Sequence, residues 1–203
     1  ITNFGSFAAA YRYIPELRAT QRNGALFRFS TLLMAFRFIT LLLSVALIYL
    51  FAAPIAEYMA VTEWVLILQC YLLVILFEGM SRFVDVFFDS LLLQGKSQVG
   101  VIFRNGLRLL GVAVFGFLLS MGQGFNLDVW IKIELVASIS GFILVGSMLF
   151  RSLYIYKQSG ISDDQIDYAR IRAYCIPSFI SQLLGGVQGP DLVKVIIMKL
   201  TDA

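Results

Sequence analysis

The 203-residue sequence contains no histidine, only two cysteines and no Asn-X-Ser/Thr glycosylation acceptor. Without histidine the chain lacks the commonest general base and metal ligand, and a Ser-His-Asp triad is excluded. The two cysteines, Cys70 and Cys175, lie far apart in apolar stretches, so we expect buried free thiols. The Gly-Lys-Ser tripeptide lacks the first glycine of a phosphate-binding loop, because Ser90 stands there. We therefore expect a protein that is not an enzyme and has neither cofactor nor metal.

Charged residues are also scarce, at 14% of the chain, whereas hydrophobic residues make up 59% and the mean hydropathy is +0.83. A soluble domain usually carries about a quarter charged residues. The composition therefore predicts an integral membrane protein. The chain begins with Ile1 rather than methionine and shows no full signal peptide, so we expect a fragment of a longer protein.

Five segments are long and apolar enough to cross a bilayer, which takes about 20 residues. They are expected at about residues 29–53, 64–93, 99–121, 129–153 and 173–200. The opening residues are expected to form the last turns of an earlier helix that stops at Pro15. The predicted fold is an all-α, polytopic transmembrane helix bundle with the end of one span and five further spans.

The segments that connect these spans alternate in charge. Lysine and arginine occur in residues 12–28, 94–104 and 151–172, and neither occurs in the two loops between them. The positive-inside rule places the three basic segments in the cytoplasm. We expect a short amphipathic surface helix capped by Ser162 in the last of them. The expected domains are an N-terminal bundle, incomplete at its start, a cytoplasmic linker and the truncated first helix of a C-terminal bundle: 1–156, 157–172 and 173–203.

Four charged side chains interrupt the second complete span. At 100° per residue, Glu78, Arg82, Asp85 and Asp89 fit an arc of about 60° on one helix face. A charge at mid-membrane costs about 3 kcal/mol or more, so this face is not expected to contact lipid. Pairing of Arg82 with Glu78 and Asp85 would leave an uncancelled charge of about −2 on the helix. We favour a face that meets water or cations on neighbouring helices, with a self-contained ladder of pairs as the alternative.

Other spans supply candidate cations. Arg37 lies well inside the first complete span, and Arg104 and Arg108 are one turn apart in the third. We expect Arg108 to face a cavity, whereas Arg104 fits a cavity and a headgroup position equally well. Lys132 and Glu134, near the outer end of the next span, are expected to be interfacial anchors.

The last predicted span combines helix-breaking and polar residues. Gln182 shares a face with two glycines, and Asp191 and Lys194 are three residues apart after Pro190. Bent helices beside a cavity are common in transporters. Mutual neutralisation of Asp191 and Lys194 is the alternative.

Two stretches resemble a known family. Phe4-Gly5 followed by Arg12-Tyr13-Ile14-Pro15-Glu16 is similar to the end of the second helix in bacterial polysaccharide (O-antigen) flippases of the multidrug/oligosaccharidyl-lipid/polysaccharide exporter superfamily. Pro177 and Asp191 resemble the proline that opens their seventh helix and the aspartate that precedes an apolar run. The resemblance implies two pseudo-symmetric six-helix bundles, a central cavity and alternating access coupled to an ion gradient.

This resemblance also implies a function. The chain would belong to a multi-pass flippase of the bacterial inner (plasma) membrane that translocates polyprenyl-pyrophosphate-linked oligosaccharide for lipopolysaccharide or other surface polysaccharide biosynthesis. Its partners would be this substrate, membrane lipids and H⁺ or Na⁺, with no nucleic acid. A cationic cavity suits a pyrophosphate, so the candidate substrate-binding residues are Arg37, Arg82 and Arg108. The candidate ion-coupling or cavity-lining residues are Glu78, Asp85, Asp89, Gln182, Asp191 and Lys194.

Three other functions are weighed against this one. The acidic face suits a cation-coupled multidrug or solute exporter of the same superfamily. A non-transporting subunit of a polysaccharide assembly complex would need a partner for activity. A membrane-embedded glycosyltransferase, polymerase or acyltransferase is disfavoured, because the chain lacks histidine and a large outer loop.

Overall fold

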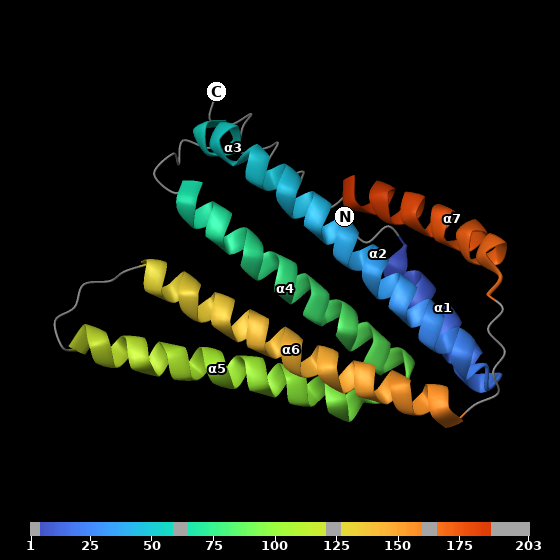
Figure 1. Cartoon of the computed structure of the whole chain (residues 1–203). Coiled ribbons are helices and arrows are strands. Elements are labelled where there is room, and N and C mark those ends of the chain that lie inside the picture. The colour runs from blue at the N-terminus through green and yellow to red at the C-terminus, as the bar shows by residue number, and fades with distance from the viewer. Residues whose placement is uncertain (1–4, 59–64, 121–126, 160–165, 188–203) are drawn as a thin grey trace.

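The structure is a computed structural model, and it describes residues 5–58, 65–120, 127–159 and 166–187 (Figure 1). Secondary structure among these residues is helical, which confirms the predicted all-α fold. Four of the described helices are long and apolar enough to span a membrane, and each overlaps one of the first four predicted spans, with ends that differ by up to six residues. They are α2 (Asn23–Leu50), α4 (Val65–Ser90), α5 (Gln94–Ser120) and α6 (Leu127–Ser159).

Three further helices are α1 (Ser6–Ala19), the short α3 (Ala52–Tyr58) and α7 (Tyr168–Val187). The prediction that the first helix stops at Pro15 is wrong, because α1 continues to Ala19 with Pro15 inside it. Proline removes one backbone hydrogen bond from a helix. Here the flanking residues Ile14 and Leu17 are buried in the core, and this packing offsets the lost bond.

The fifth predicted span begins inside α7, so the basic residues Arg170 and Arg172 lie in the first two turns of that helix. The carboxylate of Asp167 accepts a hydrogen bond from the backbone N–H of Arg170 at 3.0 Å. This is the geometry of a helix N-cap. Ser162, the predicted cap, and the far end of the predicted span lie outside the described residues.

The Asp167 cap gives a first prediction. Asp167→Ala should destabilise the first turn of α7 by about 1 kcal/mol, because the N–H of Arg170 loses its acceptor. Amide hydrogen exchange in the first turn of α7 should then be about fivefold faster. Asp167→Asn keeps an acceptor oxygen and should exchange like the unmodified protein. Equal exchange in the alanine and asparagine variants would contradict the cap.

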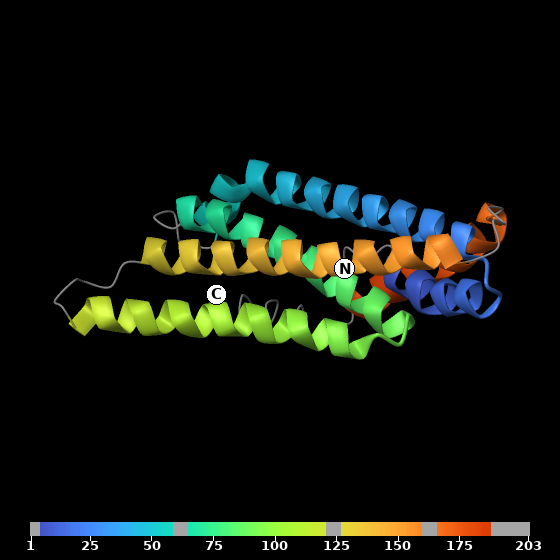
Figure 2. The ribbon, with the colours of Figure 1, turned by 60° about the horizontal axis from the view of Figure 1, so that its bottom comes forward.

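Helix α4 lies at the centre of the bundle and packs against α1, α2, α5 and α6. Its side chains Phe83, Phe87 and Phe88 are fully buried in the main core. Figure 2 shows α5 and α6 running side by side as an antiparallel pair. Helix α7 packs on α1 at the edge of the bundle (Figure 1).

The basic turns gather at one end of this bundle. Figure 1 shows the α1–α2 turn, the α4–α5 turn and the end of α6 close together. The guanidinium of Arg18 donates a hydrogen bond to the carbonyl of Leu91 and lies 5.7 Å from the ring centre of Tyr156. Lys96 donates a hydrogen bond to Ser152 at 2.8 Å. The alternation of loop charge therefore matches the up-and-down course of the chain, and the cytoplasmic placement of this end stays a prediction of the positive-inside rule.

The four helices that are long enough to span a membrane carry apolar side chains on their outer faces, such as the exposed Leu43 and Leu47 of α2. Hydrocarbon is as apolar as leucine, so such side chains need no burial in protein. The same reason explains a correction at Cys70. Its thiol was expected to be buried, but Cys70 is exposed on α4, whereas Cys175 is half-buried.

Candidate functional site

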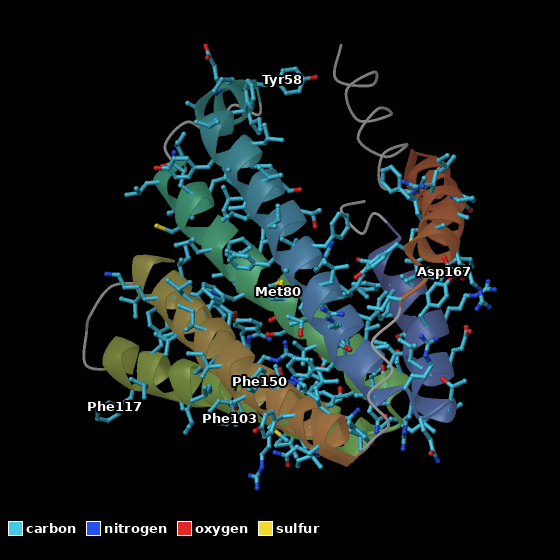
Figure 3. All side chains as sticks on the ribbon, turned by 45° about the vertical axis from the view of Figure 1, so that its right-hand side comes forward. Tyr58, Met80, Phe103, Phe117, Phe150 and Asp167 are labelled. Carbon is cyan, nitrogen blue, oxygen red and sulfur yellow. The ribbon has the colours of Figure 1, made fainter. Side chains whose placement is uncertain are left out.

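A cavity of about 550 Å³ opens between α1, α2, α4 and α5. Its charged lining consists of Arg37 from α2, Glu78 and Arg82 from α4, and Arg108 from α5. The structure thus brings all three candidate substrate-binding arginines into one cavity, from three different helices. Three positive charges against one negative charge give these lining side chains a formal charge of +2. Met80, which lies between Glu78 and Arg82 on α4, is labelled in Figure 3 in the middle of the bundle.

Carboxylates and guanidinium groups beside the cavity form a connected set of ion pairs, which we call the ion-pair cluster. Glu78 and Asp85 project from α4 toward α5, because residues seven apart lie on one helix face. Each of them meets an arginine of α5, as predicted for this face. The cluster has three acids and three bases and is therefore neutral: Glu78, Arg82, Asp85, Arg104, Arg108 and Glu134.

Arg104 joins the two carboxylates of α4. Its guanidinium lies 3.5 Å from Glu78 and 3.2 Å from Asp85, and Asp85 also accepts a hydrogen bond from Ser97 at 2.9 Å. Arg104 is only 5% exposed, so a position among lipid headgroups is excluded. Its aliphatic chain crosses α6 at Gly141, where a methyl group would overlap with it. A glycine on α6 therefore makes room for the buried arginine of α5.

Arg108 lies between two carboxylates. Its Nη2 is 3.3 Å from Glu78, and its Nε donates a hydrogen bond to Glu134 at 2.9 Å. The expectation that Glu134 is an interfacial anchor is wrong, because its side chain is 14% exposed and belongs to the cluster. Lys132, in contrast, is exposed.

The close contacts of α5 with α6 explain how Glu134 reaches Arg108. Gly100 lies against Val145, and Gly111 lies against Ile133, as in an antiparallel hairpin. One signal in the sequence fits this register, because a short connection between two spans makes them antiparallel neighbours. Pairing positions outward from that connection would have placed Glu134 within one turn of Arg108.

The other two charged residues of the α4 face are Arg82, the most exposed member of the ion-pair cluster, and Asp89. Arg82 approaches Glu78 at 3.7 Å, and its side chain is 73% exposed. Asp89 lines a different pocket, together with Tyr11 and Arg18 of α1. The alternative of a self-contained ladder on α4 is therefore wrong, because Asp85 pairs with Arg104 rather than with Arg82.

Arg37 forms the wall of the cavity on α2 and is 5% exposed. Its guanidinium carbon lies 5.5 Å from the ring centre of Phe7, which itself stacks on Phe83 at 5.3 Å. Contact of a cation with an aromatic face is favourable by about 0.5–2 kcal/mol. Packing between α1, α2 and α4 therefore helps to hold this guanidinium at the cavity.

Three candidate residues cannot be placed in the cavity. Gln182 lies in the last turns of α7, beyond the side chains that the structure describes. Asp191 and Lys194 lie outside the described residues. Their roles in lining a cavity or in ion coupling stay predictions.

Among the residues that the structure describes, no group of three or more histidine, cysteine, aspartate or glutamate side chains could hold a metal ion. Comparison of the chain with protein-family models, with curated proteins and with solved structures finds no match.

Proposed function

We propose that the chain is part of a flippase that moves polyprenyl-pyrophosphate-linked oligosaccharide across the bacterial inner membrane. The observation that carries this proposal is the cavity lined by Arg37, Arg82 and Arg108. Guanidinium groups pair with phosphate oxygens in a bidentate geometry, which makes arginine suited to a pyrophosphate. The volume of the cavity, about 550 Å³, lies within the range of known ligand sites.

The three arginines differ in how they would contribute. Arg82 is the most accessible, so it suits the first contact with an entering anion. Arg108 is held by Glu78 and Glu134, which fix the direction of its guanidinium. Arg37 supplies a positive charge from the α2 wall. An anionic headgroup in such a cavity would exchange its water shell for cations that are already in place, which lowers the cost of crossing the bilayer.

The ion pairs favour the handling of an anion over the binding of a cation. Glu78 and Asp85 each contact arginine, so their negative charge is already compensated within the protein. A cation-coupling carboxylate would need to exchange its arginine for the ion. The cation-coupled exporter is therefore the less favoured function.

The proposal predicts that Arg37→Ala and Arg108→Ala each lower transport about tenfold, because each removes about 1.4 kcal/mol of interaction with the anion. The measurement is the translocation of labelled lipid-linked oligosaccharide, or surface glycan assembly in cells, with the full-length protein. Lys132→Ala is the matched control, since Lys132 is an exposed cation of α6 that does not line the cavity.

Normal transport in both arginine variants would exclude the cationic-cavity mechanism. If deletion of the protein abolishes drug resistance but leaves surface glycans intact, the chain would be assigned to the exporters instead. Transport that appears only when a partner protein is added would assign it to an assembly complex.

A further inference from the structure

A second cavity, of about 390 Å³, lies between α2 and α6, and we call it the α2–α6 groove. Its wall on α2 includes Phe27 and Met34, and its wall on α6 includes Ile143, Gly146 and Phe150. Phe150, labelled in Figure 3, is 62% exposed and Ile143 is 63% exposed, so the groove opens on the surface. Both helices are long and apolar enough to span the membrane, which places this opening at bilayer depth.

The hydroxyl groups that line the α2–α6 groove are directed to the protein. Thr31 donates its hydrogen to the carbonyl of Phe27 at 2.9 Å, and Ser147 donates to the carbonyl of Leu144 at 2.8 Å. Ser30 has no exposed surface at all. The groove therefore presents hydrocarbon to its occupant, and an apolar chain is the ligand that loses least by entering it.

A cation stands at one end of the α2–α6 groove. Lys157 lies seven residues after Phe150, on the same face of α6. Its ammonium is exposed and lies 4.9 Å from the ring centre of Phe27, which lines the groove. This is the end of the bundle where the basic turns gather, at the level expected for lipid headgroups. An apolar groove that ends at an ammonium is complementary to an amphiphile with a negative head.

The dimensions fit one leaflet of a bilayer. From Ile143 to Lys157 the helix α6 rises about 21 Å, at about 1.5 Å per residue. One half of the hydrocarbon core is about 15 Å thick, and the headgroup layer adds to it. A single lipid can therefore place its phosphate at Lys157 and its acyl chain along Gly146 and Ile143.

We propose that the α2–α6 groove is a binding site for an anionic phospholipid of the leaflet on the basic side, with one acyl chain in the groove and the phosphate at Lys157. The site shares no lining residue with the arginine cavity. It is therefore separate from the proposed transport function, and variants of the groove test it alone.

Gly146→Leu is the decisive variant. The nearest atom to a Cβ built at Gly146 is in the ring of Phe142 at 4.0 Å, so a side chain can start from this lining position without a clash, and a leucine there would occupy space in the groove. Gly116→Leu is the matched control, because the exposed Gly116 of α5 also has room for a side chain but lies elsewhere. Lys157→Gln tests the headgroup contact.

The measurement is native mass spectrometry of the purified protein from micelles with equal amounts of phosphatidylglycerol and phosphatidylcholine. We expect the unmodified protein and Gly116→Leu to retain phosphatidylglycerol with about a fivefold preference, the contribution of one lysine near an anionic surface. Gly146→Leu should lose about nine-tenths of the retained lipid. Lys157→Gln should retain both lipids about equally.

Two outcomes would overturn the proposal. One is lipid retention by Gly146→Leu that equals that of Gly116→Leu. The other is a dimer of the unmodified protein that Gly146→Leu converts to a monomer while the bound lipid stays unchanged, since this would assign the groove to a second copy of the chain.

Discussion

Arg104→Ala should lower the free energy of unfolding by about 3–5 kcal/mol, the loss typical of breaking a buried ion pair from one side. Arg104 is 5% exposed and contacts two carboxylates of α4. Glu78 keeps its contacts with Arg82 and Arg108 in the variant. Asp85 keeps the hydroxyl of Ser97 but loses its cation, so a carboxylate at membrane depth would be left without charge compensation.

The reason for the loss can be tested by removing both charges. In Arg104→Met combined with Asp85→Leu, neither an unpaired acid nor an unpaired base is created, and most of the lost stability should return. The measurement is unfolding in mixed micelles with increasing denaturing detergent, with Lys132→Ala as the exposed-cation control. Two results would contradict a stabilising role for the Arg104–Asp85 ion pair. One is an Arg104→Ala variant as stable as Lys132→Ala, and the other is a double variant less stable than Arg104→Ala.

Hydropathy and loop charge were sufficient to predict the four long helices and their up-and-down course. The ends of helices were harder to predict, because they depend on contacts that are distant in the sequence. At Pro15 the local rule favours an end, but burial of Ile14 and Leu17 keeps α1 helical to Ala19. The N-cap of α7 is Asp167, whose carboxylate accepts a hydrogen bond from the N–H of Arg170.

For the charged residues, too, local sequence patterns predicted part of the arrangement, and contacts between helices determined the rest. The 100° periodicity correctly put Glu78 and Asp85 on one face, but it could not say which arginine lies opposite. Within α4 the obvious partner is Arg82, yet the antiparallel packing of α5 brings Arg104 to Asp85 instead. Glu134 was misassigned because its partner, Arg108, comes from another helix. Sequence periodicity thus defines a helix face, whereas the register between helices defines its partners.

Gly141→Ala should destabilise the protein by about 3 kcal/mol although it changes no charge. A methyl group at Gly141 would overlap with the Cγ and Cδ atoms of Arg104. The ion pairs with Glu78 and Asp85 hold the far end of that side chain, so the arginine cannot move aside without breaking them. Overpacking usually costs about 1–3 kcal/mol, and loss of the pairs brings the effect to the upper end of this range.

Gly146→Ala on the same helix is the control, because its nearest neighbour is the ring of Phe142 at 4.0 Å. This control should be as stable as the unmodified protein or more stable by up to about 1 kcal/mol, since alanine is the better helix former. Equal effects of the two alanines in a thermal or detergent unfolding assay would contradict a specific role for Gly141.

The strongest test is to combine Gly141→Ala with Arg104→Ala. The new methyl group would lie 3.6 Å from the Cβ of residue 104, which is an ordinary van der Waals contact, and the atoms that caused the overlap would be gone. The double variant should therefore be no less stable than Arg104→Ala alone, and the two losses should not add. Additive losses would mean that Gly141 acts through the α5–α6 backbone contact and not through Arg104. Non-additivity would show that a glycine of α6 is required because a charged side chain of α5 crosses it inside the membrane.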